Sequence, residues 1–181
     1  MIIHPKNNFE RMFGPYPDGH CFDIENSAIL KKINDKAKQG EGVKIAEFLL
    51  LRTVNDKTSI SIIEAKSSAP QNVDEYINDV QKKLSNSLSL FIAIYLQRHS
   101  KNNSELSDFF KQTELSNVRF ILILAIQNCE KSRLPPLQDK LKKALKKTAR
   151  IWNIDLNSVI VLNEAGAKKH GLITSITTQQ I

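Results

Sequence analysis

The sequence VKIAEFLLLRTV-NDK-TSISIIEAK occupies residues 43–66 and does most to decide the fold. Apolar and β-branched residues dominate both flanks, which is typical of strands. Asn55, Asp56 and Lys57 separate the two flanks and are residues of a short turn. The pattern therefore predicts a β-hairpin whose strands are residues 43–54 and 58–66.

A turn centred between Asn55 and Asp56 fixes which residues of the hairpin face each other. Val54 then pairs with Lys57 and Glu47 with Glu64, while Lys66 shares the face of Glu64 because side chains alternate along a strand. Opposed Cβ atoms lie ~4.5–5.5 Å apart, so two carboxylates placed in this way repel each other. A divalent metal would neutralise them, and Mg²⁺ commonly takes one or two carboxylates together with water.

Two alternatives to this site stay open. In the first, the hairpin ends at a solvated rim, where Glu64 and Lys66 simply face water. In the second, the strand register differs by one residue, which would turn Glu47 to the opposite face and remove the pair of carboxylates.

The remainder of the chain predicts helices that alternate with strands. Apolar residues recur at helical spacing in three segments, residues 26–38, 73–97 and 135–152. Two further apolar segments are predicted strands, residues 118–126 and 159–162. This order predicts an α/β (α+β) fold in which helices flank a mixed central β-sheet. No repeat or linker interrupts it, so we expect a single domain over residues 1–181.

The composition is that of a folded globular protein. Of the 181 residues, 41% are hydrophobic and 25% are charged, which excludes a disordered polyelectrolyte. The apolar runs are shorter than the ~20 residues of a membrane helix, and the first residues do not resemble a secretory signal. Cys21 and Cys129 are too few for a disulfide framework or a zinc cluster. We therefore expect a soluble intracellular (cytoplasmic) protein with no membrane partner.

Positive charge is concentrated towards the end of the chain. Lys and Arg number 26 against 19 Asp and Glu, and residues 131–150 hold eight basic residues against the single acid Asp139. On the predicted helix, Lys140, Lys143 and Lys147 share one face. This face is either the solvated side of an amphipathic helix or a ridge that follows the phosphates of a nucleic acid.

Glu47, the tripeptide Glu64-Ala65-Lys66 at the end of an apolar strand and the long helix after it resemble the PD-(D/E)xK phosphodiesterase (nuclease) superfamily. The resemblance covers residues 24–128 and implies a restriction-endonuclease-like core, with the C-terminal basic helix and strand as additions. It implies that Glu47 and Glu64, helped by the main-chain carbonyl of Ala65, bind Mg²⁺ or Mn²⁺. It also implies that Lys66 orients or activates the attacking water. Glu47 departs from the Asp that is commonest at this place.

Three further residues are candidates for the site. The resemblance implies Glu25 as an additional metal ligand, because some members carry an upstream acid there. The alternative is an acid that simply favours a helix N-terminus. Gln81 and Ser67 are candidates for contacts with the substrate.

Together these features predict a metal-dependent endo- or exonuclease that hydrolyses phosphodiester bonds, with DNA favoured over RNA. In this interpretation Lys140, Lys143 and Lys147 bind the substrate. The resemblance also implies a homodimer, because cutting two strands needs two sites. The alternative is a catalytically inactive nucleic-acid-binding or assembly module with the same fold, since Glu47 replaces the usual Asp.

Overall fold

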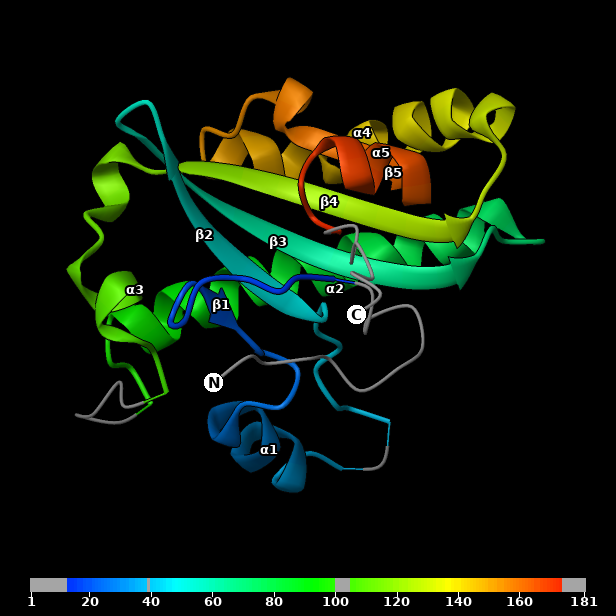
Figure 1. Ribbon diagram of the computed structural model, residues 1–181. Coiled ribbons are helices and arrows are strands. Elements are labelled where there is room, and N and C mark those ends of the chain that lie inside the picture. The colour runs from blue at the N-terminus through cyan, green and yellow to red at the C-terminus, as the bar shows by residue number, and fades with distance from the viewer. Residues whose placement is uncertain (1–12, 39, 100–104, 174–181) are drawn as a thin grey trace, which may run out of the picture.

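The computed structural model describes residues 13–38, 40–99 and 105–173, and a five-stranded sheet lies at its centre (Figure 1). The strands are β1 (Cys21–Phe22), β2 (Phe48–Val54), β3 (Lys57–Ser68), β4 (Arg119–Asn128) and β5 (Val159–Asn163). They lie side by side in chain order. β2 is antiparallel to both of its neighbours, β1 and β3. β4 runs parallel to β3, and β5 runs parallel to β4. The predicted mixed sheet is confirmed.

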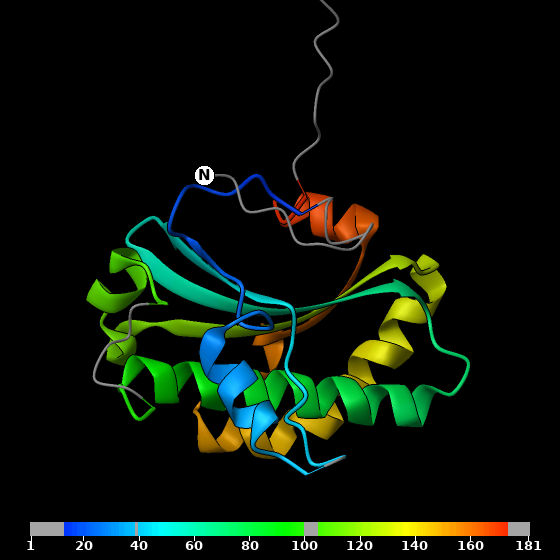
Figure 2. The ribbon, with the colours of Figure 1, turned by 90° about the horizontal axis from the view of Figure 1, so that it is seen from below.

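Helices cover both faces of the sheet (Figure 2). They are α1 (Ala28–Asp35), α2 (Val73–Tyr95), α3 (Asp108–Gln112), α4 (Leu134–Ile151) and α5 (Glu164–Lys169). α1, α2 and α4 lie on one face, over the larger core. α5 lies on the other, where Ala167 joins a smaller core with Phe48 and Ile63. Among the described helices, none combines the length and apolar character that a membrane span requires.

α2 and α4 carry the chain between the parallel strands. α2 connects β3 to β4, and α4 connects β4 to β5, because parallel neighbours need a crossover and cannot be joined by a tight turn. Leu141 and Leu145 of α4 are fully buried in the same core as Leu84 and Leu88 of α2. α4 and β5 therefore extend the main sheet and its larger core.

β2 and β3 form the predicted hairpin in the predicted register. Val54 pairs with Lys57, and Phe48 pairs with Ile63 at the other end of the ladder. Asn55 and Asp56 make the turn with φ values of 50° and 58°. Positive φ at both central residues suits the twist of a two-residue hairpin turn, and Asn and Asp tolerate it better than most side chains.

β2 begins at Phe48, whereas the sequence predicts a strand from residue 43. Two backbone donors before Phe48 are satisfied by side chains of helices. The N–H of Val43 donates to Oδ1 of Asn34 in α1, and the N–H of Ala46 donates to Oγ of Ser87 in α2, both at 2.8 Å. The apolar side chains of this segment are buried against helices, which explains why its composition resembles that of a strand.

Three short elements are absent from the sequence prediction, namely β1, α3 and α5. β1 has two residues and pairs with Leu49 and Leu50 of β2. α3 has five residues and α5 has six. Elements of this length complete too few periods of a hydrophobic pattern to be recognised, so contacts with distant segments define them.

Both cysteines are expected to react slowly in the folded protein. Burial, followed by the negative charge of Asp23, raises the pKa of Cys21 to about 12, and burial raises the pKa of Cys129. Because the thiolate is the nucleophile, we expect alkylation of Cys21 at pH 8 to be on the order of 10²–10³-fold slower than in the unfolded chain, and alkylation of Cys129 also to be slower. Iodoacetamide pulses with and without guanidinium, followed by mass spectrometry, measure this ratio. Equal rates would contradict the packing of β1 against β2.

Candidate active site

Glu64 lies on β3, and its side chain is wholly buried on the face that α2 covers. Its Oε1 accepts from Nζ of Lys66 and from Nζ of Lys83 on α2, each at 2.9 Å. Its Oε2 is also buried and has no hydrogen-bond partner within the described part of the chain. Lys66 shares this face, as the alternation along β3 requires. Glu64 therefore keeps one acceptor oxygen for a further ligand.

Lys83 is the member of this cluster that the sequence prediction missed. Its side chain is 16% exposed, against 30% for Lys66. On α2 it lies three residues after Val80 and four residues before Ser87, and both of these are fully buried. A lysine on the buried stripe of a predicted helix is the signal that could have revealed it, because such a charge needs a partner.

Glu47 and Glu25 also influence Lys83 through their charge. Glu47 lies at a bend directly before β2 and is 9% exposed. The predicted pairing of Glu47 with Glu64 is absent from the β2–β3 ladder, which ends at Phe48 and Ile63. The backbone N–H of Glu47 donates instead to the carbonyl of Ile63 at 3.1 Å. The N–H of Glu25 donates to the carbonyl of Glu47 at 3.4 Å, and both carboxylates act electrostatically on the Lys83 ammonium. Lys83 is therefore in direct contact with Glu64 and within electrostatic range of Glu47 and Glu25.

Burial and charge act in opposite directions on the central pair. Burial raises the pKa of Glu64, and the ammonium groups of Lys83 and Lys66 offset only part of the increase. Burial alone would lower the pKa of Lys83, but the charges of Glu64, Glu47 and Glu25 raise it above its ordinary value. Shifts of this kind are typical of functional sites, and structural ion-pair networks also produce them.

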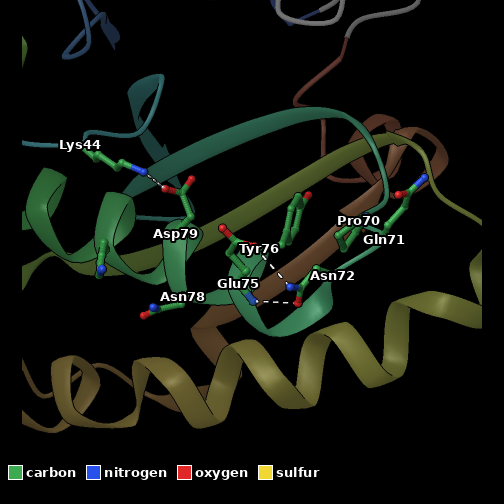
Figure 3. Close-up of a pocket in the computed structure, with 9 residues that line it drawn as sticks. Lys44, Pro70, Gln71, Asn72, Glu75, Tyr76, Asn78 and Asp79 are labelled. Atoms are coloured by element: carbon green, nitrogen blue, oxygen red, sulfur yellow. Dashed lines mark hydrogen bonds and ion pairs between the residues drawn. The ribbon is translucent and has the colours of Figure 1, made fainter. Parts of the chain in front are cut away.

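A cavity of about 640 Å³ lies along the first turns of α2, and its lining includes none of the cluster residues Glu64, Lys66 and Lys83 (Figure 3). At one end, Lys44 and Asp79 point toward one another, with Nζ 2.5 Å from Oδ1. Asp79 also interacts electrostatically with Lys66 and Lys83. No sequence motif marks the cavity, because its walls come from three places: the segment before β2, the segment after β3 and the first turns of α2.

Tyr76 provides a second link between this cavity and the cluster. It lines the cavity from α2, and Figure 3 shows its ring between Asp79 and Pro70. Its hydroxyl is buried and makes no hydrogen bond to any described residue. Burial, followed by the charge of Glu64, raises the pKa of Tyr76, so the hydroxyl stays protonated and can donate at neutral pH.

Gln81 and Ser67, the predicted substrate contacts, lie in different surroundings. Nε2 of Gln81 donates to Oγ of Ser85 at 3.2 Å, and Ser85 in turn bonds to Thr148 of α4 at 2.8 Å. Gln81 therefore faces α4, away from Glu64, since residues two positions apart on a helix point to opposite sides. Ser67 is exposed near the end of β3, and its carbonyl accepts from Asn128 at 3.0 Å.

The predicted basic face lies on the exposed side of α4. Lys143 and Lys147 are exposed, whereas Leu141 and Leu145 face the core. Lys140 is also exposed, but its ammonium pairs with the carboxylate of Asp74 at the start of α2. A solvated helix surface and a ridge for phosphates both fit this arrangement.

Oε2 of Glu64 is the oxygen of this cluster at which a hard cation could bind. This oxygen has no partner within the described part of the chain, Glu47 and Glu25 act electrostatically on the neighbouring Lys83, and Ala65 follows Glu64 in β3. In residues 13–38, 40–99 and 105–173, no group of three or more His, Cys, Asp or Glu side chains could hold a metal ion by itself. Mg²⁺ commonly keeps several waters and takes only one or two carboxylates. A divalent cation bound to Oε2 of Glu64 would therefore need water for most of its remaining ligands.

Comparison with known proteins does not assign this chain to a family. No family model, no curated protein and no solved structure matches this chain. The resemblance to the PD-(D/E)xK superfamily therefore depends on the hairpin residues and on their arrangement beside α2.

Proposed function

We propose that this protein is a metal-dependent nuclease of the PD-(D/E)xK type that hydrolyses phosphodiester bonds in DNA. The observation that carries the proposal is the contact between Glu64 and Lys66 near the end of β3. It combines a buried carboxylate, one oxygen of which has no described partner, with a lysine that reaches the surface. The order of α1, β2, β3, α2 and β4, with β4 parallel to β3, supports a restriction-endonuclease-like core.

In this proposal Glu64 and Glu47 hold Mg²⁺ or Mn²⁺, together with the carbonyl of Ala65 and with Glu25 close by. Such an ion would polarise the phosphate and make a bound water more acidic. Lys66 orients the attacking water and donates to a phosphate oxygen on which negative charge develops. The water oxygen bonds to phosphorus, one P–O ester bond breaks, and a proton from the water ends on the leaving oxygen. The products are one phosphate end and one hydroxyl end.

The exposed lysines of α4 supply the binding surface for the substrate in this proposal. Lys143 and Lys147 would follow the phosphate backbone through charge, without reading the base sequence. Two copies of the chain, each cutting one strand, are the arrangement that we propose for cleavage of duplex DNA.

Two observations favour a second function. Lys83 donates to the same carboxylate that would bind the metal, and position 47 carries Glu in place of the commonest Asp. The alternative is a catalytically inactive module of the same fold that binds nucleic acid or takes part in assembly. Mn²⁺ binding separates the two functions, because a module that only binds nucleic acid has no reason to hold a metal at Glu64.

Lys66→Ala is expected to reduce the rate of DNA cleavage by roughly 10²–10³-fold, because it removes a donor to the charge that develops in the transition state. The measurement is nicking and linearisation of a plasmid in Mg²⁺. Lys57→Ala is the matched control, since Lys57 lies exposed at the other end of the same strand.

The control should cleave at the rate of the wild type, and EDTA should stop both. If Lys66→Ala and Lys57→Ala cleave equally fast, Lys66 has no part in the reaction and the proposal is wrong.

A further inference from the structure

The candidate site contains a cation of its own on α2. Nζ of Lys83 is 2.9 Å from Oε1 of Glu64, whose side chain has no exposed surface. Glu47 and Glu25 act on the same ammonium. Lys83 is therefore in contact with one of the acids to which the proposed function assigns the metal, and within electrostatic range of the other two.

An ammonium in this place competes with a divalent cation. Both are positive and both use the same carboxylates, so an ammonium that stayed in contact with Glu64 would repel the bound metal. The burial of Glu64 strengthens this repulsion, because charges inside a protein are screened less than charges in water. Lys83 and Lys66 already share Oε1, which leaves Oε2 as the remaining acceptor of this carboxylate.

We propose that Lys83 is a built-in counter-ion that holds the site in a resting state and that leaves Glu64 when Mg²⁺ or Mn²⁺ binds there. The inference rests on the proposed function, since it takes Glu64 as a metal ligand. It adds a means of regulation: the acids stay paired without metal, and metal occupancy depends on how readily Lys83 moves. Lys66 is the more exposed of the two lysines and remains beside the substrate.

Asp79 offers Lys83 a second acceptor. It lies four residues earlier on α2, a spacing at which side chains on one helix are neighbours. Its side chain is 27% exposed, lines the cavity and pairs with Lys44, as Figure 3 shows. Asp79 already interacts electrostatically with Lys83. Because lysine has a flexible four-carbon stem, Lys83 can exchange Glu64 for Asp79 without a movement of the helix.

Mn²⁺ titration by calorimetry tests the competition without any measurement of cleavage. Lys83→Met keeps the length of the side chain and removes its charge, so Mn²⁺ is expected to bind at least roughly tenfold more tightly than to the wild type. A neighbouring charge commonly changes the affinity of a carboxylate for a proton by this much or more. Lys82→Met is the matched control: it is the adjacent residue, it is exposed, and it should leave the affinity unchanged.

The outcomes separate the inference from the proposed function. Tighter binding by Lys83→Met alone supports the competition. Equal Mn²⁺ binding by the wild type and by Lys83→Met overturns the inference and leaves the nuclease proposal standing. Absence of Mn²⁺ binding in both proteins overturns the inference and the metal-dependent function together.

A second measurement uses the wild type, so it does not depend on the folding of Lys83→Met. The ¹⁵Nζ resonance of Lys83, identified by its absence in Lys83→Arg, is followed by NMR during a Mg²⁺ titration. We expect it to move as Mg²⁺ binds. A resonance that stays unchanged while Mg²⁺ saturates the protein would contradict the displacement of Lys83.

Discussion

Glu64→Gln is expected to lower the rate of phosphodiester cleavage by on the order of 10²–10³-fold or more. The amide has nearly the shape of the carboxylate but carries no charge, so it can neither hold a divalent cation firmly nor compensate Lys66 and Lys83. The rate is measured under single-turnover conditions with labelled DNA in Mg²⁺. Glu75→Gln, the same change at an exposed acid on the neighbouring helix, is the matched control and should retain activity.

The buried position of Glu64 also decides which substitution is informative. Glu64→Ala would leave two ammonium groups without their shared acceptor, and breaking a buried ion pair in this way commonly costs about 3–5 kcal/mol of the free energy of unfolding. Loss of activity in Glu64→Ala would therefore be confounded with loss of structure. Thermal unfolding of Glu64→Gln checks that it is folded, and a folded Glu64→Gln with the activity of the wild type would contradict the proposed site.

The double substitution Lys143→Gln/Lys147→Gln is expected to weaken DNA binding roughly tenfold or more at ~0.1 M salt. Each phosphate contact that is lost should also lower the slope of log affinity against log salt by about 0.9 for duplex DNA. Fluorescence anisotropy with a labelled duplex, measured at several salt concentrations, gives both quantities. Stability should hardly change, because both side chains are exposed.

Lys140→Gln provides a comparison within the same helix. The ammonium of Lys140 is engaged by Asp74, so its removal should weaken DNA binding less than removal of either of the other two lysines. If the double variant binds DNA with the affinity and the salt slope of the wild type, the basic face of α4 is only a solvated surface.

Much of the fold could be predicted from short-range patterns in the sequence. The alternation of residues 58–66 and the Asn55-Asp56 turn fix the hairpin register, and with it the positions of Glu64 and Lys66 on one face. The long apolar stripe of α2 and the buried run of β4 are equally visible, since each covers several periods of its pattern.

The composition of the candidate site could be predicted only in part. The role of Lys83 could not be predicted from the sequence, because its contact with Glu64 forms only when α2 packs against β3. Glu47 lies just outside the ladder: its own N–H bonds to the carbonyl of Ile63, while the N–H of Ala46 before it bonds to Ser87 of α2. Local patterns do not report contacts of this kind, and the cavity along α2 was invisible for the same reason.

The measurement that tests the central claim most directly is cleavage by the wild type. Labelled linear, circular and branched DNA, and RNA, are incubated with the purified protein in Mg²⁺ or Mn²⁺, with EDTA and Glu64→Gln as controls. The proposed function predicts cleavage of at least one DNA substrate that needs the metal and is lost in Glu64→Gln. No cleavage of any substrate, together with no Mn²⁺ binding by the wild type, would contradict it and would favour the nucleic-acid-binding or assembly module.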